Sequence, residues 1–101
     1  MGLPVILTPQ ATDDLGGIVR RIAQDSPERA KSFGHALLDA ALAIAPFPGR
    51  GRVVPEVKDL AVREVLHGHY RIIYEFRRAP DAVYVLRFWH AARGTPELPT
   101  G

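Results

Sequence analysis

The chain has 101 residues, of which 47% are hydrophobic and 24% charged, and it contains no cysteine. This length and balance predict one globular domain, residues 1–101, with a single modest core. The lack of cysteine excludes disulfides, thiol catalysis and thiolate metal sites. No apolar run approaches the roughly 18 residues that a membrane-spanning helix needs, and the first residues lack the basic and apolar regions of a signal peptide. We therefore expect a cytoplasmic protein without membrane contact.

The formal net charge is only +2, but the basic side chains are unevenly placed. Residues 46–101 carry nine Lys or Arg against six Asp or Glu, whereas residues 1–45 carry four against five. Eleven of the basic residues are arginine and two are lysine. The guanidinium group suits phosphate and carboxylate recognition, so this usage favours an anionic partner. The arginine usage of a GC-rich genome explains the same bias equally well.

The first half of the chain predicts a strand and two helices. A short apolar run at residues 5–7 predicts the strand. Thr8-Pro9 and Ser26-Pro27 each predict a helix start, because a hydroxyl accepts a hydrogen bond from a free amide and proline is favoured at the first helical position. Two apolar stripes at helical spacing follow: Ala11, Leu15, Ile18, Val19 and Ile22, then Ala30, Phe33, Leu37, Ala40, Ala41 and Ile44. Such closely linked helices predict a helical hairpin that packs on a sheet.

Three details of these helices carry further expectations. Gly16 and Gly17 each cost about 0.8–1 kcal/mol relative to alanine inside a helix. We expect them to allow close approach of the second helix at this point, in preference to the alternative of a functional kink. Asp13 and Asp14 are expected to interact with the positive end of the first helix dipole. Pro46 is expected to stop the second helix.

The second half of the chain predicts three strands. Residues 70–77 alternate between apolar and polar side chains, which predicts a half-buried strand. Residues 61–66 are expected to be its antiparallel partner, with Gly68 supplying the backbone angles of the turn. Residues 83–90 predict the last strand, because the turn sequence 78–81 precedes them.

The remaining segments lack a periodic pattern. Residues 47–55 are rich in glycine and proline and predict a loop. Residues 94–101 are expected to be an irregular tail with little to pack against. The predicted order is therefore β-α-α-β-β-β, an α+β fold in which a helical hairpin packs on a small, largely antiparallel sheet.

The histidines are the first candidates for chemistry. His67 and His69 have a spacing that could hold a metal, but no third ligand stands at a recognisable distance in the sequence. We therefore expect polar turn residues there, and neither a metal nor another cofactor. His90 ends the last predicted strand close to Arg93. It could transfer a proton or be a hydrogen-bonded residue at the sheet edge, and the sequence leaves both open.

Arginines are the second candidates. Arg71 lies on the polar side of the central strand, Arg63 lies one strand away and Arg93 follows the last strand. A sheet face with several arginines and no matching acids would bind a phosphodiester or the acidic surface of a protein. The alternative is a solvated face in which Glu64 and Glu75 pair with these arginines across the strands.

Several of these features occur together, in the same order, in a known group of proteins. They are the opening strand with Thr8 to Leu15 and Ile18, residues 26–30, the Gly/Arg loop 46–55, Val62-Arg63-Glu64, Tyr70-Arg71-Ile72-Ile73-Tyr74, and residues 83–93 with the ending His90-Ala91-Ala92-Arg93. In this combination the chain resembles the RelE/ParE superfamily of bacterial type II toxins. The resemblance implies a growth-inhibiting toxin of the same β-α-α-β-β-β order. It also implies neutralisation by a cognate antitoxin, in a complex where the antitoxin follows the helical hairpin and sheet.

The superfamily divides by target. RelE-like members cut mRNA on the ribosome with arginines and lysines around the sheet and a tyrosine or histidine near the C-terminus, whereas ParE-like members poison DNA gyrase. Arg71, His90 and Arg93 match, but residues 94–101 hold no tyrosine and the loop has no clear counterpart of the lysine pair. The resemblance therefore implies a ParE-like gyrase poison that is not an enzyme.

On this interpretation the target-binding residues are Arg63, Arg71, His90 and Arg93, and none is catalytic. One alternative is a RelE-like ribosome-dependent mRNA endoribonuclease, with the ribosome and mRNA as partners and Arg71, His90 and Arg93 as catalytic residues. Another is a protein of the toxin fold that has lost toxicity and only binds its partner.

Overall fold

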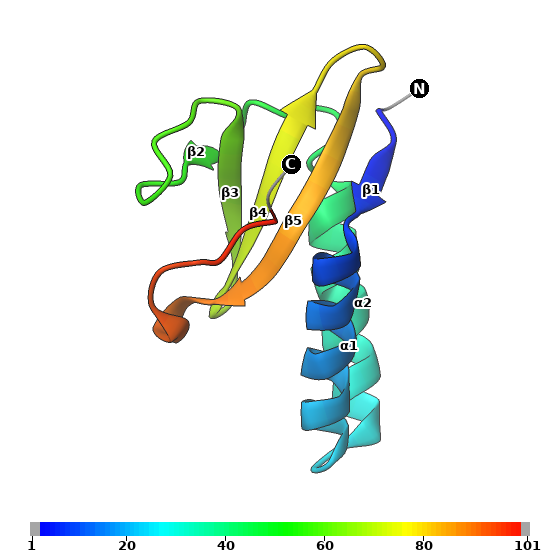
Figure 1. Ribbon diagram of the computed structural model, residues 1–101. Coiled ribbons are helices and arrows are strands. Elements are labelled where there is room, and N and C mark those ends of the chain that lie inside the picture. Colours follow the sequence, from blue (N-terminus) through cyan, green and yellow to red (C-terminus); the bar gives the residue numbers. More distant parts are fainter. Residues whose placement is uncertain (1–2, 100–101) are drawn as a thin grey trace.

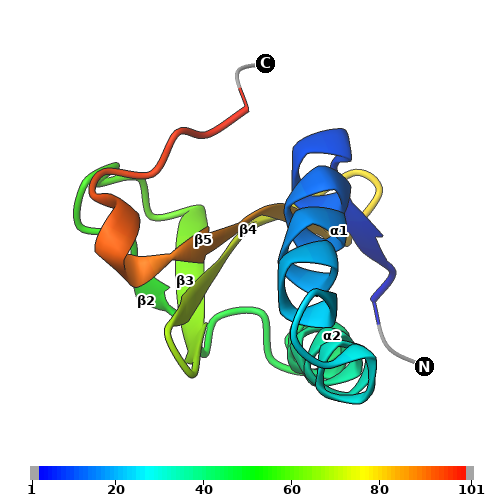
Figure 2. The same ribbon diagram turned by 90° about the horizontal axis from the view of Figure 1, so that it is seen from below.

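The computed structural model describes residues 3–99, which form a five-stranded sheet with two helices on one face (Figures 1 and 2). The elements are β1 (Val5–Leu7), α1 (Pro9–Ala23), α2 (Pro27–Leu42), β2 (Arg52–Val53), β3 (Val62–His67), β4 (Tyr70–Arg77), β5 (Ala82–His90) and the 3₁₀ helix η1 (Ala91–Arg93). The strand order is β1-β5-β4-β3-β2, in which only the β1–β5 pair is parallel. The predicted α+β fold is confirmed, and the predicted order omits only β2, a two-residue strand inside the expected loop. None of the helices between residues 3 and 99 has the length and hydropathy to cross a membrane.

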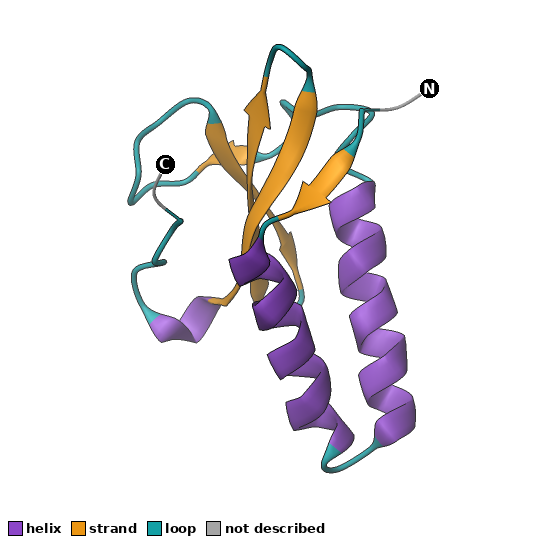
Figure 3. Cartoon of the chain, turned by 45° about the vertical axis from the view of Figure 1, so that its right-hand side comes forward, coloured by secondary structure: helices purple, strands orange, loops and turns teal. Residues whose placement is uncertain are grey.

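Both helices begin where the sequence predicts. The hydroxyl of Thr8 accepts from the backbone N–H of Ala11 at 3.2 Å, and that of Ser26 accepts from the N–H of Arg29 at 3.2 Å. Each cap is followed by a proline, whose missing N–H leaves no unsatisfied donor at that position. α2 ends at Leu42, before Pro46. The two helices then lie side by side as a hairpin (Figure 3).

The expected role of the aspartates in α1 is wrong. Asp13 and Asp14 lie beyond the first turn, which contains no acidic residue. Asp14 instead accepts from both Arg87 Nε and Nη2, at 2.7 and 2.8 Å, and from the backbone N–H of Phe88 at 3.1 Å. These three bonds join α1 to β5, so Asp14 fixes the position of the helix on the sheet.

The close contact between the helices lies at a different glycine from the one expected. A Cβ at Gly34 in α2 would lie 2.8 Å from Cγ2 of Val19 in α1. At Gly16 and Gly17, by contrast, a Cβ would meet only the flexible end of Arg20, at 3.2 and 3.9 Å. The expectation for Gly16-Gly17 is therefore wrong, and Gly34 is the residue that lets the helices approach.

The central strand β4 is buried on both faces, so the prediction of a half-buried strand is wrong. Its apolar side chains Tyr70, Ile72 and Tyr74 belong to the cluster beneath the helices. On the opposite face, which we call the outer face, Ile73 packs in a second cluster. The members of this second cluster are Val54, Val62, Ile73, Leu86 and Trp89, with Val57, Tyr84 and Leu98 packed against them. The segment that follows β2 and the C-terminal segment therefore cover the outer face.

The C-terminal segment is irregular as expected, but it does pack against the sheet. It turns back from η1 on the side of the sheet away from the helices (Figures 1 and 3). Arg87 Nη1 donates to the carbonyl of Glu97 at 2.7 Å, and Trp89 Nε1 donates to that of Gly94 at 3.2 Å. Pro96 is buried and Leu98 joins the outer cluster. Part of the expectation falls on residues 100–101, which lie outside the described residues.

The hairpin between β3 and β4 follows the sequence prediction. His67 pairs with Tyr70 at its closed end, and Gly68 adopts a φ of 57°, in the left-handed region that favours glycine. Pairing of β4 with β5 then places Tyr70 opposite His90 and Arg71 opposite Trp89. The turn thus brings His67, His69 and His90 to one end of the sheet.

Alanine substitutions at two helical glycines test this packing. Gly17→Ala is expected to raise the free energy of unfolding by up to about 1 kcal/mol, because the helix gains propensity without a clash. Gly34→Ala is expected to lower the free energy of unfolding by about 1 kcal/mol. The cost of overpacking against Val19 there exceeds the stabilisation from the higher helix propensity of alanine. Urea denaturation of both variants measures the difference, and equal stabilisation by both would contradict the assigned contact.

Candidate functional site

Arg71 lies at the buried centre of an ion cluster and not on an open cationic face. Its Nε donates to Glu64 at 2.6 Å, while Nη1 and Nη2 donate to the two carboxylate oxygens of Glu56 at 3.0 and 2.7 Å. Arg52 Nε donates to the other oxygen of Glu64 at 2.6 Å. Arg71 is 7% exposed and Glu64 is 1% exposed. The expectation of a face whose arginines lack matching acids is therefore wrong at Arg71, and pairing with Glu64 is the alternative that holds.

The cluster shifts the ionisation of its members. Hydrogen bonds from Arg71 are the main reason that the pKa of Glu56 falls to about 2, because they stabilise the charged carboxylate more than burial disfavours it. The hydrogen bond with Glu56 is likewise the main cause that raises the pKa of Arg71. Both groups are thus charged at neutral pH, and each neutralises the other.

Arg63 supports the loop before β2. Its Nη1 donates to the carbonyl of Gly51 at 2.9 Å. The hydroxyl of Tyr74 holds the same loop, because it donates to the carbonyl of Pro48 at 2.6 Å and accepts from the N–H of Gly51 at 3.0 Å. Burial raises the pKa of Tyr74, so its hydroxyl keeps the proton that it donates. The alternation in residues 70–77 placed Tyr74 on the apolar side of a strand, but the sequence gave no signal for these bonds.

His90 and Arg93 lie together at the end of the sheet. His90 Nδ1 accepts from the backbone N–H of Ala92 at 3.1 Å, which makes it a hydrogen-bonded residue at the start of η1. Its ring stacks with that of His69 at 6.0 Å and meets the ring of Tyr70 edge-on at 5.1 Å. The exposed Arg93 places its guanidinium 3.9 Å from the ring centre of Trp89, a cation–π distance.

Two hollows flank Tyr70 and His90. The smaller, about 220 Å³, is polar and contains Asp13, Arg21 and Arg93 among its lining residues. Arg21 Nη2 donates to the hydroxyl of Tyr70 at 2.7 Å. The structure thus joins His90 and Arg93 with Arg21, a residue that the sequence did not single out, whereas Arg63 and Arg71 line neither hollow.

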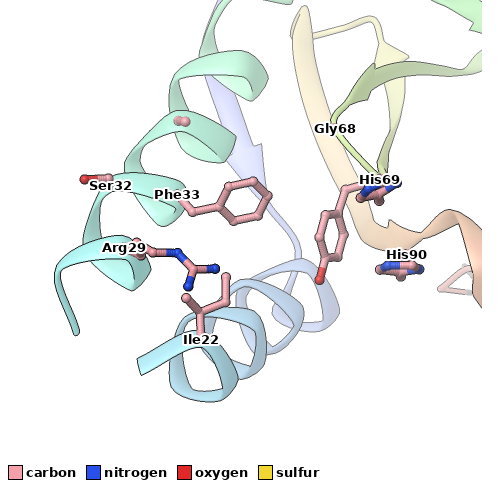
Figure 4. A pocket seen from close by; sticks show the side chains of 9 residues that line it. Ile22, Arg29, Ser32, Phe33, Gly68, His69 and His90 are labelled. Carbon is pink, nitrogen blue, oxygen red and sulfur yellow. The ribbon is translucent and has the colours of Figure 1, made fainter. Parts of the chain in front are cut away.

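The larger hollow, about 590 Å³, separates α2 from the turn between β3 and β4, and we call it the α2–β4 groove (Figure 4). Its lining residues are Ile22, Arg29, Ser32, Phe33, Ala36, Gly68, His69, Tyr70 and His90. The ring centres of Phe33, on α2, and Tyr70, on β4, are 5.7 Å apart. The sequence predicted Phe33 as a core residue, but it is only partly buried and one side of it faces this groove. Helical spacing alone could not distinguish these two environments.

The histidines do not assemble a metal site. Within residues 3–99 there is no group of three or more His, Cys, Asp or Glu side chains that could hold a metal ion. His67 and His69 flank the turn as separate side chains, with His67 packed near Phe33 at 5.9 Å and His69 near His90.

Comparisons with known proteins identify the class. A family model described as ParE toxin of type II toxin–antitoxin system, parDE, matches residues 5–94. The chain therefore belongs to the ParE toxin family, and the expected membership of the RelE/ParE superfamily is confirmed. No curated protein matches the sequence.

Two solved structures share the fold. A chain of the chromosomal ParDE toxin–antitoxin system from P. aeruginosa has a TM-score of 0.71 at 15% identity, with 87% of this chain and 95% of that chain covered. A chain of the toxin–antitoxin complex RelBE2 from Mycobacterium tuberculosis has a TM-score of 0.65 at 22% identity, with 89% of this chain and 99% of that chain covered. At these identities the likeness establishes a shared fold.

The ion cluster predicts a pH dependence of stability. The folded state lowers the pKa of Glu56 from 4.5 to about 2, so its contribution is present above about pH 4.5 and is lost as pH falls toward 2. Urea denaturation between pH 2 and pH 6 should show this loss in the parent chain and a flatter profile in Glu56→Gln. Glu75→Gln removes a carboxylate from the more exposed pair with Arg77 and serves as the control. A parent profile no steeper than that of Glu56→Gln would contradict the assignment.

Proposed function

We propose that this ParE-family chain arrests growth by binding and poisoning DNA gyrase, without chemistry of its own, and that a cognate antitoxin neutralises it. Family membership supports a toxin role. The observation that carries the choice of mechanism is the occupied guanidinium of Arg71.

A nuclease mechanism would need Arg71 to stabilise the charge that develops on a phosphate. Nε, Nη1 and Nη2 of Arg71 all donate to the carboxylates of Glu56 and Glu64. A phosphodiester that approached this point would meet two carboxylates whose charges Arg71 and Arg52 together already balance. Displacing Glu64, which is 1% exposed, would leave a buried charge unpaired, which is costly.

The other elements of a nuclease site are also missing or engaged. His90 Nδ1 is occupied by the N–H of Ala92, which leaves only Nε2 for proton transfer. The tyrosines are Tyr70, Tyr74 and Tyr84, and residues 91–101 contain none. These observations support a toxin that acts by binding.

We place the contact with gyrase at the sheet end, where Arg93 is exposed and His90 lies beside it. Arg63 lines a separate hollow with Leu60, Phe76 and Arg78, and it retains exposed surface for a partner. Arg71 would act indirectly, because its buried side chain keeps β3, β4 and the segment after β2 together.

We place the antitoxin along the helical hairpin and the sheet. An apolar hollow of about 340 Å³ lies between α1 and α2, with Leu15, Val19, Gly34 and Leu38 among its lining residues. Both similar structures come from toxin–antitoxin systems. An apolar face of this kind on a helix pair suits a helical segment of a partner, and the resulting assembly would be a hetero-oligomer.

A supercoiling assay with purified gyrase, relaxed plasmid and antitoxin-free chain tests the proposal. Inhibition of supercoiling with accumulation of cleaved DNA is the expected result. Unaffected supercoiling would contradict the gyrase proposal, and cleavage of mRNA on ribosomes would then establish the nuclease alternative. If the chain neither inhibits gyrase nor cleaves mRNA but still binds an antitoxin, the third alternative, a toxin fold without toxicity, would be established.

The contact residue is tested by Arg93→Ala in the same assay. We expect about tenfold weaker inhibition, or about 1.4 kcal/mol, because an exposed arginine stacked on a tryptophan is a typical interface anchor. Arg77→Ala is the matched control, because Arg77 pairs with Glu75 near the other end of β4. Inhibition unchanged by Arg93→Ala would remove Arg93 from the contact.

A further inference from the structure

The α2–β4 groove combines an apolar wall with a cationic rim. Ile22, Phe33 and Ala36 supply apolar surface from the two helices, and Tyr70 supplies the facing wall from β4. In Figure 4 the guanidinium of Arg29 extends beside Phe33 and above Ile22. Among residues 3–99, no aspartate or glutamate lines the groove. A ligand that fills it would therefore bury apolar atoms and place an anionic group at the rim.

The arginines around the groove have no acidic partner within the described part of the chain. The ion pairs found there involve Arg52, Arg71, Arg77 and Arg87, and thus neither Arg21 nor Arg29 nor Arg93. Arg21 is oriented by the hydroxyl of Tyr70, which accepts its hydrogen bond but carries no charge. Each guanidinium can therefore still pair with a carboxylate of a partner.

The groove and the smaller hollow share a wall, because Tyr70 and His90 line both. That hollow adds Arg21 and Arg93 on the far side of Tyr70. Asp14, which also lines it, is already bound to Arg87. The combined surface thus has an apolar pocket with arginines on both sides, and Asp13 as its remaining acid.

The wall of the groove is also formed in advance. Tyr70 is 7% exposed and its ring contacts Phe33 on one side and His90 on the other. Because these rings already pack against one another, a partner would lose little free energy in ordering them. Aromatic residues and arginine are also the residue types enriched at binding hot spots.

We propose that the α2–β4 groove receives a large apolar side chain, flanked by carboxylates, from an acidic surface segment of gyrase. This inference rests on the proposed function, since it takes gyrase as the partner and defines which surface holds it. A nucleic acid fits less well, because its phosphates need a row of cations and the body of the groove is apolar.

Two substitutions on exposed positions of α2 test the groove without removing core atoms. Ser32→Trp fills the groove, and Arg29→Glu reverses the charge at its rim. Thr12→Trp and Arg20→Glu make the same changes on the exposed face of α1, at residues that do not line either hollow. Thermal melting shows whether each variant is folded. The two groove variants are independent tests, because one changes the volume of the groove and the other changes its charge.

The measurement is the dissociation constant of antitoxin-free chain for immobilised gyrase holoenzyme, determined by biolayer interferometry without DNA. We expect Ser32→Trp and Arg29→Glu to weaken binding by at least about tenfold, and the two α1 controls to change it by less than about twofold.

Several results would overturn the inference. Unchanged affinity in the groove variants, or equal loss in the α1 controls, would overturn it while the proposed function stands. No binding of the parent chain to gyrase would overturn both. Binding of the parent chain to plasmid DNA alone, weakened by Arg29→Glu, would assign the groove to nucleic acid and also overturn it.

Discussion

The ion cluster of Arg71 with Glu56 and Glu64 adds side-chain bonds between strands that are already paired, and it ties the irregular segment after β2 to the sheet. It ties β4 to β3 through Glu64, and to the segment after β2 through Glu56, while Arg52 of β2 binds Glu64 from the other side. Removing one partner of a buried ion pair typically costs about 3–5 kcal/mol, because the remaining charge stays buried. The covered outer face, with Trp89 and Ile73 in its own apolar cluster, depends on this arrangement.

The outer face and the end of the sheet differ in how their charged side chains are used. The outer face uses its charges internally, and between residues 3 and 99 it leaves no buried side-chain nitrogen or oxygen without a hydrogen-bond partner. The end of the sheet, in contrast, holds Arg93, Arg21 and Arg29 beside the rings of Tyr70 and His90, and none of the three arginines has an acidic partner among the described residues. A protein that acts by binding needs such an end, where charges and apolar surface face outward. The ParE family assignment agrees with this division.

Local signals in the sequence predicted most of the fold. The caps at Thr8 and Ser26, the alternation in β4 and the turn at Gly68 each depend on neighbouring residues, so their patterns are visible in the chain. The proximity of His90 and Arg93 at the sheet end was predictable for the same reason. Long-range contacts were not: Glu56 lies 15 residues from Arg71 within an irregular segment, and Leu98 reaches the outer cluster from the tail. Arg21, Arg29 and Phe33 were missed because helical spacing does not show which part of a helix reaches the sheet end.

The most direct test of the account is mRNA integrity on translating ribosomes exposed to antitoxin-free chain, read by primer extension. If the carboxylates of Glu56 and Glu64 fully occupy Arg71, the chain has no phosphate-stabilising arginine there, and the account predicts that the mRNA remains full length. Cleavage within the codon at the ribosomal A site, abolished by Arg71→Ala in a variant that still folds, would contradict it.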